Sequence, residues 1–204
     1  DLFKFKFICE AKLSPDGRNT AYVVTSVDPE EMEEGSSIWL YSLDSGSSRR
    51  FTFGGRDSSP EWSPDGRNIA FLSNRSDKTQ VFIIPSGGGE AKQLTSLKQG
   101  VGGGPKWSPD GRMIAFTAPR ERDEGEEDPE KPFRVSRNIY RFDKMGYLKN
   151  AIQDIYVSPV EGEGLEQLTD DDCNNTLMEW SPDSKEILYT TSMFPDSHRI
   201  RPSL

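Results

Sequence analysis

Few residues of this 204-residue chain could do acid–base or nucleophilic chemistry. Its one histidine, His198, stands in the polar stretch 195–199, which predicts an exposed loop. In a serine hydrolase of the α/β-hydrolase type, such a histidine lies beside a serine on a G-x-S-x-G turn between a strand and a helix. No G-x-S-x-G occurs in the chain, so we expect it to contain no catalytic residue.

The residues also give little support to a metal or phosphate site. Cys9 and Cys173 lie far apart without a C-x-x-C pair, so neither a zinc site nor a disulfide is predicted. The run Asp170-Asp171-Asp172 lacks the alternate spacing and distal glutamate of a calcium loop, and it predicts a solvated turn. The glycine-rich stretch 100–104 lacks the Lys-Ser/Thr ending of a phosphate loop, and it predicts a connection between blades. We expect no metal and no cofactor.

The composition narrows the classes of partner. The chain has 34 acidic and 25 basic residues, and its net charge of −9 disfavours binding to nucleic acid. The longest apolar runs, 69–72 and 81–85, are far shorter than a membrane span, and no signal segment opens the chain. Together with the two isolated cysteines, these features predict a cytoplasmic protein that binds neither nucleic acid nor membrane.

An internal repeat determines the expected fold class. The string S-P-D-G-R occurs three times, and a fourth copy differs at its last two positions; the copies lie at 14–18, 63–67, 108–112 and 181–185. Trp62, Trp107 and Trp180 precede the last three copies, and Leu13 precedes the first. The copies are about 45 residues apart, except for an insertion before the fourth, and this period is typical of β-propeller blades.

Each copy predicts a tight turn between two strands. Proline favours the second position of a type I turn, aspartate can bond back to the backbone, and glycine supplies a positive φ. The segments after the turns are apolar at consecutive positions, which indicates strands buried on both faces; they are 21–24, 69–72, 114–116 and 187–189. A third strand, a turn rich in glycine or serine and a short polar strand follow in the first three units.

We therefore predict an all-β fold, a β-propeller with four-stranded blades, of which three are complete and a fourth is only begun. The predicted blades span about 8–53, 58–96, 104–170 and 176–204, with an insertion at 119–150 in the third. A closed ring of four blades is compatible with the length, but the fourth repeat stops after its return strand. A fragment of a seven- or eight-bladed ring is the more economical interpretation.

The order of the segments resembles the N-terminal propeller of the prolyl oligopeptidase family of serine peptidases, in its acylaminoacyl-peptidase and dipeptidyl-aminopeptidase branch. The resemblance rests on L-F-K-F at 2–5, L-S-P-D-G-R at 13–18, S-S-I-W-L-Y at 36–41 and F-T-F-G-G at 51–55. Residues 140–148 of the insertion are similar to a Y-R-x-D-x-x-G-Y segment of that family. The S-P-D-G-R repeat alone is also shared with TolB-type propellers.

The resemblance implies a propeller that covers the mouth of a C-terminal α/β-hydrolase domain carrying the catalytic triad. The expected function is to gate the access of short or N-terminally blocked peptides to that hydrolase, while the chain itself is non-catalytic. The expected partners are the hydrolase domain of the same protein, peptide substrates and a second copy of the chain. The alternative is a TolB-type propeller that binds proteins and has no hydrolase.

The insertion departs in composition from the blades. Seven carboxylates lie within 121–130 and must remain in water, because like charges at this density repel. Arginines interleaved with aromatic residues follow, a composition typical of interfaces. We expect an interface formed by Arg137, Tyr140, Arg141 and Tyr147. The alternative is a hairpin packed on its own blade.

Overall fold

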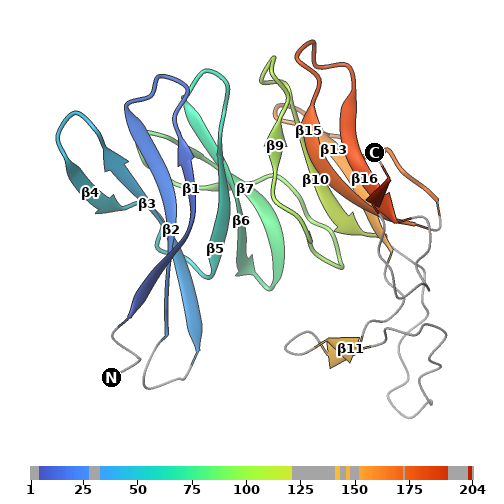
Figure 1. Cartoon of the computed structure of the whole chain (residues 1–204), viewed down its shortest axis with the longest axis horizontal. Coiled ribbons are helices and arrows are strands. Elements are labelled where there is room, and N and C mark those ends of the chain that lie inside the picture. Colours follow the sequence, from blue (N-terminus) through green and yellow to red (C-terminus); the bar gives the residue numbers. More distant parts are fainter. Residues whose placement is uncertain are drawn as a thin grey trace.

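The structure, a computed structural model, describes residues 5–27, 33–120, 141–142, 146–147, 152–171, 173–192 and 202–203. Every regular element in these segments is a β-strand (Figure 1). The strands form four sheets that stand side by side, and a separate hairpin of β11 (Arg141–Phe142) and β12 (Gly146–Tyr147). The described chain is therefore all-β, as predicted.

The first three sheets have four antiparallel strands each, paired in chain order. The first sheet contains β1 (Lys6–Leu13), β2 (Asn19–Val27), β3 (Glu34–Ser42) and β4 (Ser47–Arg50). The second contains β5 (Asp57–Trp62), β6 (Asn68–Ser76), β7 (Lys78–Pro85) and β8 (Lys92–Gln93). The third contains β9 (Lys106–Trp107), β10 (Met113–Pro119), β13 (Gln153–Pro159) and β14 (Glu166–Gln167). The fourth contains β15 (Asn174–Trp180), β16 (Ile187–Ser192) and β17 (Pro202–Ser203), and we assign each sheet to one blade.

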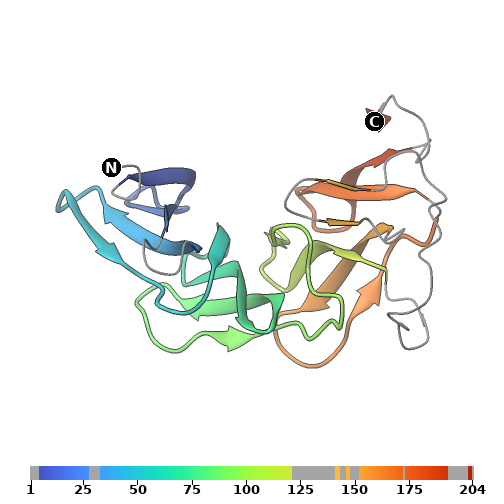
Figure 2. The ribbon, with the colours of Figure 1, turned by 90° about the horizontal axis from the view of Figure 1, so that it is seen from below.

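The first strands of the four sheets converge. Strand β5 contacts both β1 and β9, and β15 contacts β9. Seen from below, the sheets form an open arc with the first and fourth sheets at its two ends (Figure 2). This arrangement confirms the predicted propeller with three complete blades and a begun fourth, and it excludes a closed ring of these four sheets.

Apolar side chains fill the space between neighbouring sheets. Alternate residues of β6 serve two different cores: Ile69 and Phe71 pack towards the first sheet, whereas Ala70 and Leu72 pack towards the third. All four side chains are buried. The prediction of a strand buried on both faces is therefore confirmed for β6, and β10 is buried in the same way.

The same prediction is wrong for β16 of the fourth sheet. Leu188 and Tyr189 are exposed, although they occupy the positions of Ala70 and Phe71 relative to the turn. For Leu188, whose equivalent Ala70 packs towards the following sheet, the physical reason is that no described sheet packs against the outward face of the fourth sheet. Tyr189 stands at the position of Phe71, which packs towards the preceding sheet, and the open outward face does not explain its exposure. A consecutive apolar run is buried on both faces only where a sheet stands on each side of it.

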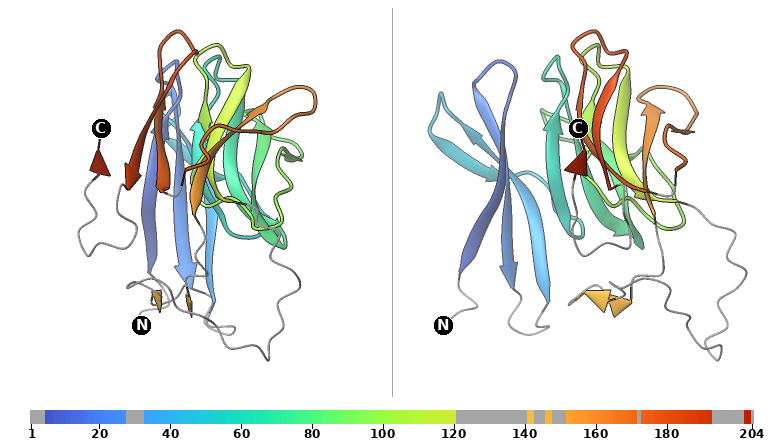
Figure 3. Two further views of the ribbon diagram at one scale, coloured as in Figure 1. Left: turned by 90° about the vertical axis from the view of Figure 1, so that its right-hand side faces the viewer. Right: turned by 45° about the vertical axis from the view of Figure 1, so that its right-hand side comes forward.

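The repeated turns lie together at one end of the sheets (Figure 3). Gly17, Gly66 and Gly111 have φ between +70° and +72°, and Ser184 of the fourth copy has φ +62°. In each turn the N–H of this residue donates to the carbonyl of the serine three positions earlier, at 2.8–3.0 Å. The predicted turn chemistry is confirmed, including the positive φ that favours glycine.

Candidate functional site

Four charged side chains lie on the first strands of the four sheets, where these strands converge. Each stands two positions before the serine of its turn, and the four are Lys12, Glu61, Lys106 and Glu179. Lys12 Nζ lies 2.9 Å from Glu61 Oε2, and Lys106 Nζ lies 3.9 Å from the same oxygen. Lys106 Nζ also lies 3.2 Å from Glu179 Oε2. We call these residues the charge belt, because they alternate in sign and link four consecutive sheets.

The charge belt stabilises the charged form of Lys12. The hydrogen bond to the Glu61 carboxylate raises the pKa of Lys12 above the ordinary lysine value, although burial acts in the opposite direction. Pairing therefore exceeds desolvation at this lysine. The inner edge of the arc carries fixed charges of both signs at neutral pH, and among these four residues the charges balance.

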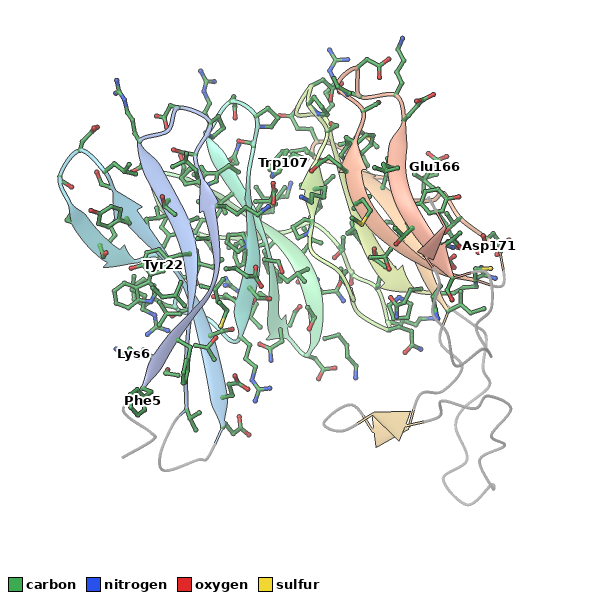
Figure 4. The ribbon with its side chains drawn as sticks, viewed as in Figure 1. Phe5, Lys6, Tyr22, Trp107, Glu166 and Asp171 are labelled. Carbon is green, nitrogen blue, oxygen red and sulfur yellow. The ribbon has the colours of Figure 1, made fainter. Side chains whose placement is uncertain are left out.

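In the second, third and fourth sheets, the tryptophan after the belt member ties its sheet to the preceding one. Trp62 Nε1 donates to the carbonyl of Lys12 at 3.0 Å, and Trp107 Nε1 donates to the carbonyl of Glu61 at 3.1 Å. Trp180 Nε1 donates to the carbonyl of Lys106 at 3.1 Å. Figure 4 shows Trp107 between the second and third sheets. Lys12, Glu61 and Lys106 thus each hold the following sheet twice, through the side chain and through the main-chain carbonyl.

The turns above the belt are held by a repeated set of hydrogen bonds. In the second copy, Ser63 Oγ donates to Asp65 Oδ1 at 2.6 Å and the Arg67 N–H donates to the same oxygen at 3.0 Å. Ser63 Oγ also accepts from the N–H of Asn68 at 2.9 Å. The first and third copies repeat these bonds. The serine bond, followed by the arginine N–H, lowers the pKa of Asp65 below its ordinary value.

Successive turns touch one another. A Cβ on Gly66 would lie 3.7 Å from Pro15 Cδ, and one on Gly111 would lie 3.8 Å from Pro64 Cδ. Between the third and fourth turns, the N–H of Asp110 donates to Ser184 Oγ at 3.1 Å. The turns therefore form a continuous row at this end of the arc.

Two cavities lie between neighbouring turns. One of about 310 Å³ lies between the first and second turns, with Trp62 in its wall, and one of about 840 Å³ lies between the second and third, with Trp107 in its wall. Both are lined by the serine, the aspartate and the following asparagine of the earlier turn and by the glycine of the later one. They are repeated features of the joint between blades.

Two arginines form ion pairs at the other end of the second and third sheets. Arg75 Nη2 lies 3.0 Å from Asp57 Oδ1, and the Arg75 guanidinium stands over the rings of Phe71 and Phe82. Asp57 and Asp154 are fully buried. Arg120 Nε lies 2.6 Å from Asp154 Oδ2, and Arg120 Nη1 lies 2.9 Å from Asp170 Oδ1. These contacts fix the ends of β6 and β10.

The glycine-rich stretch 100–104 lies between β8 and β9, as predicted for a connection between blades. Close packing favours glycine at position 103, because a Cβ there would lie 2.9 Å from Thr117 Cβ. Asp171 accepts hydrogen bonds from the N–H of Cys173 and from Asn175 Nδ2. These contacts belong to the fourth sheet and its approach.

The predicted interface is only partly within the described residues. Arg137 and Tyr140 lie outside them, as does His198. Arg141 and Tyr147 stand opposite each other in the β11–β12 hairpin. The insertion leaves β10 and returns to β13 at the end of the third sheet away from the turn (Figure 1).

Cys9 and Cys173 are free thiols. Within the described segments, no three His, Cys, Asp or Glu side chains are grouped so that they could hold a metal ion. No helix long and apolar enough to cross a membrane occurs there either.

Sequence reasoning missed the charge belt. The signal was present, because the residue before Leu13 or the repeat tryptophan alternates between lysine and glutamate in the four copies. What could not be read from the sequence is that all four side chains face the same edge.

Comparisons with known proteins agree with this architecture. Residues 5–125 match the PD40 family, described as the TolB beta propeller domain, and the chain therefore belongs to that family of β-propellers. The chain is 31% identical over 210 residues to an "Uncharacterized peptidase YuxL" of Bacillus subtilis, a match that covers 99% of this chain and 32% of that protein. It thus spans about a third of the length of this curated relative.

Solved structures show the same fold. The structure is similar to Pyrococcus horikoshii acylaminoacyl peptidase, with a TM-score of 0.72 and 22% identity over 92% of this chain and 28% of that one. It is also similar to a putative TolB from Agrobacterium tumefaciens, with a TM-score of 0.57 and 24% identity over 88% of this chain and 57% of that one. These findings confirm the predicted resemblance to peptidase propellers, and they show that TolB-type propellers share the architecture.

Proposed function

We propose that this chain is the N-terminal propeller part of a serine peptidase, where it limits access of peptides to an α/β-hydrolase domain that follows it. The observation that carries the proposal is the match to the YuxL peptidase, which covers almost all of this chain at 31% identity but only 32% of that protein. The remaining length of such a protein has room for a catalytic domain. The proposal places the protein in the cytoplasm, and the free thiols Cys9 and Cys173 support that location.

The chain's share of the mechanism would be steric. Each sheet is joined to its neighbour by a belt ion pair and a tryptophan hydrogen bond, so the inner edge of the arc is a stiff wall. A wall of this kind admits an extended peptide and excludes a folded protein. Chemistry would belong to the hydrolase domain, because the G-x-S-x-G motif is absent from the 204 residues.

A first experiment tests whether the chain is non-catalytic. We expect no hydrolysis of an acyl-amino-acid ester and no covalent labelling by a serine-directed phosphonate, because the sequence supplies no elbow serine. The control is a serine hydrolase of known activity under the same conditions. Stoichiometric labelling of this chain would contradict the proposal.

A second experiment tests the gating role in the full-length gene product. We would compare kcat/KM for an acylated tripeptide with that for a peptide of about 30 residues, before and after truncation of the propeller. Steric gating predicts that truncation raises relative turnover of the long peptide while leaving ester hydrolysis nearly unchanged. An unchanged ratio between the two substrates would refute gating even if the hydrolase is present.

The insertion is proposed to contact the hydrolase domain or a second copy of the chain. The support is its composition, since Arg137 and Arg141 offer planar bidentate donors and Tyr140 a large rigid surface. Arg137→Ala with Arg141→Ala should weaken assembly or turnover of the full-length protein by at least about 1 kcal/mol, with little change in the melting of the isolated chain. A less stable chain with normal assembly and turnover would instead indicate packing on its own blade.

A TolB-type binding module without a hydrolase is the second candidate. The observation that favours it is the family match itself, whose description names TolB, together with the TolB structure of similar fold. A gene product with a signal peptide and no G-x-S-x-G would support this candidate, whereas phosphonate labelling of a downstream serine would exclude it.

A further inference from the structure

The cavity between the second and third turns differs from its equivalent between the first and second in size and charge. Its volume is about 840 Å³, against about 310 Å³ for the other. Sites that bury most of a small ligand have volumes of roughly 300 to 1,000 Å³, so the larger cavity has room for a ligand of substantial size. The smaller cavity is lined by one carboxylate and one guanidinium, those of Asp16 and Arg49, so its charges balance. We call the larger one the joint cavity, because it lies where the second and third sheets meet.

Apolar side chains form part of the wall of the joint cavity. Trp107 is buried in this wall, whereas Met113 and Val160 are half-buried. Pro64 and Pro109 also line the cavity, and both are exposed. Because these two prolines belong to the turns themselves, a ligand can enter between the turns, and a chain longer than the cavity can continue past it on the surface.

The charged part of the lining has an excess of negative charge. It contains the carboxylates of Asp65, Asp110 and Glu161 and one cationic group, the Arg112 guanidinium. The Arg112 side chain is 85% exposed, so its head projects into solvent and does not fill the cavity. The joint cavity therefore attracts cations, unlike the smaller cavity with its balanced charges.

Both turn aspartates have one carboxylate oxygen that lies beyond hydrogen-bond distance of its nearest cation. Their Oδ1 atoms accept from the serine hydroxyl and from the N–H of the turn arginine, and these bonds lower the pKa of Asp65 and of Asp110. Asp65 Oδ2 lies 3.8 Å from Arg67 Nε, and Asp110 Oδ2 lies 4.0 Å from Arg112 Nε. Both aspartates are thus charged at neutral pH and can accept a hydrogen bond from a further cation.

We propose that the joint cavity binds a lysine or arginine side chain of an extended peptide. The hydrocarbon part of this side chain lies against Trp107 and Met113, and its cationic head lies among Asp65, Asp110 and Glu161. Charge complementarity selects this occupant, because an uncharged ligand leaves the carboxylates unpaired and an anionic one is repelled by them. The inference goes beyond the proposed function, because it requires no hydrolase.

Calorimetric titration of the full-length gene product tests the proposal. The probe is the peptide acetyl-Ala-Leu-Lys-Leu-Ala-amide, and two control peptides carry norleucine or glutamate in place of its lysine. A serine-directed phosphonate added beforehand blocks any hydrolase, so that the titration measures binding alone. We expect the lysine peptide to bind about tenfold more tightly than the norleucine peptide, and the glutamate peptide to bind more weakly still. The difference should shrink as salt rises from about 50 to about 500 mM, because salt screens charges at the surface.

Two glutamates of one turn provide a matched pair of variants. Glu161 lines the joint cavity, Glu163 lies outside its lining, and both are exposed, so neither change should disturb the fold. Glu161→Gln should weaken binding of the lysine peptide about threefold, whereas Glu163→Gln should leave it unchanged. Arg112→Gln should strengthen binding about twofold, because it removes a competing cation. Equal affinities for the lysine and norleucine peptides, equal effects of the two glutamate variants, or no binding at about 1 mM peptide would each overturn the proposal.

Discussion

Trp107→Phe isolates the contribution of one tryptophan hydrogen bond between sheets. The Trp107 ring packs in the core between the second and third sheets and is 7% exposed, and its Nε1 donates to the carbonyl of Glu61 at 3.1 Å. Phenylalanine keeps an aromatic ring in the site but removes the donor. The change therefore tests whether the repeat tryptophan is required for bonding as well as for volume.

The expected cost follows from two contributions. Loss of the hydrogen bond costs about 1 kcal/mol net. Loss of the second ring removes roughly 50 Å² of buried apolar surface, or about 1 kcal/mol at 25 cal/mol per Å². We expect a total of about 2 kcal/mol, which at a urea dependence near 2 kcal/mol per molar lowers the unfolding midpoint by about 1 M.

Trp180→Phe is the matched control. Its Nε1 makes the same bond at 3.1 Å to the carbonyl of Lys106, but Trp180 is less buried than Trp107. We expect about half the shift in urea midpoint, measured by far-ultraviolet circular dichroism. A midpoint unchanged by Trp107→Phe, or a larger shift for Trp180→Phe, would refute the assignment of these bonds as joints between sheets.

Three further changes test other parts of the repeat. Gly66→Val should cost about 1 to 3 kcal/mol from backbone strain at φ +70°, whereas Gly87→Val, in open space without a positive φ, should leave the urea midpoint within about 0.5 M. Asp65→Asn should make the free energy of unfolding less dependent on pH in the acid range. The lowered pKa of Asp65 in the folded state stabilises the fold above the unfolded-state pKa near 4, and this stabilisation is lost as the pH falls through the folded-state pKa. Identical acid denaturation curves for the two proteins would contradict this prediction. Arg120→Met should destabilise the protein by about 3 kcal/mol because it leaves the buried Asp154 carboxylate without Arg120, and adding Asp154→Leu should restore part of the loss in the same urea assay.

The fold was predictable because its repeat combines three independent signals. The turn string, the consecutive apolar residues after it and the preceding tryptophan each indicate the same unit, and the structure confirms all three in the second and third sheets. Burial of Leu188 was predicted wrongly. An apolar strand sequence shows that a strand can pack on both faces, but whether both faces are buried depends on a neighbouring sheet. Such long-range information is absent from the residues of the strand itself.

The site was less predictable for a related reason. Lys12 and Glu61 are 49 positions apart, since 61 − 12 = 49, and no local pattern marks an ion pair across that separation. Aligning the four copies on their turns would have revealed the alternation of charge. Only the convergence of the first strands shows that these charges meet. By contrast, the proposed interface of the insertion was chosen from composition alone, and its test remains the double arginine substitution.

The location of the joints bears on how the propeller could select substrates. The belt pairs and tryptophan bonds lie near the turns, while the pairs Arg75–Asp57 and Arg120–Asp154 fix the opposite ends of the second and third sheets. Each arginine pair lies within a single sheet and holds the strands of that sheet together. Bending between neighbouring sheets would instead break a belt ion pair and a tryptophan hydrogen bond, which join the sheets near the turns. The proposed selection by this wall would follow from the size of the opening that it borders. For that reason the comparison of short and long peptides, with ester hydrolysis as reference, is the assay that separates a steric filter from a change in the chemical step.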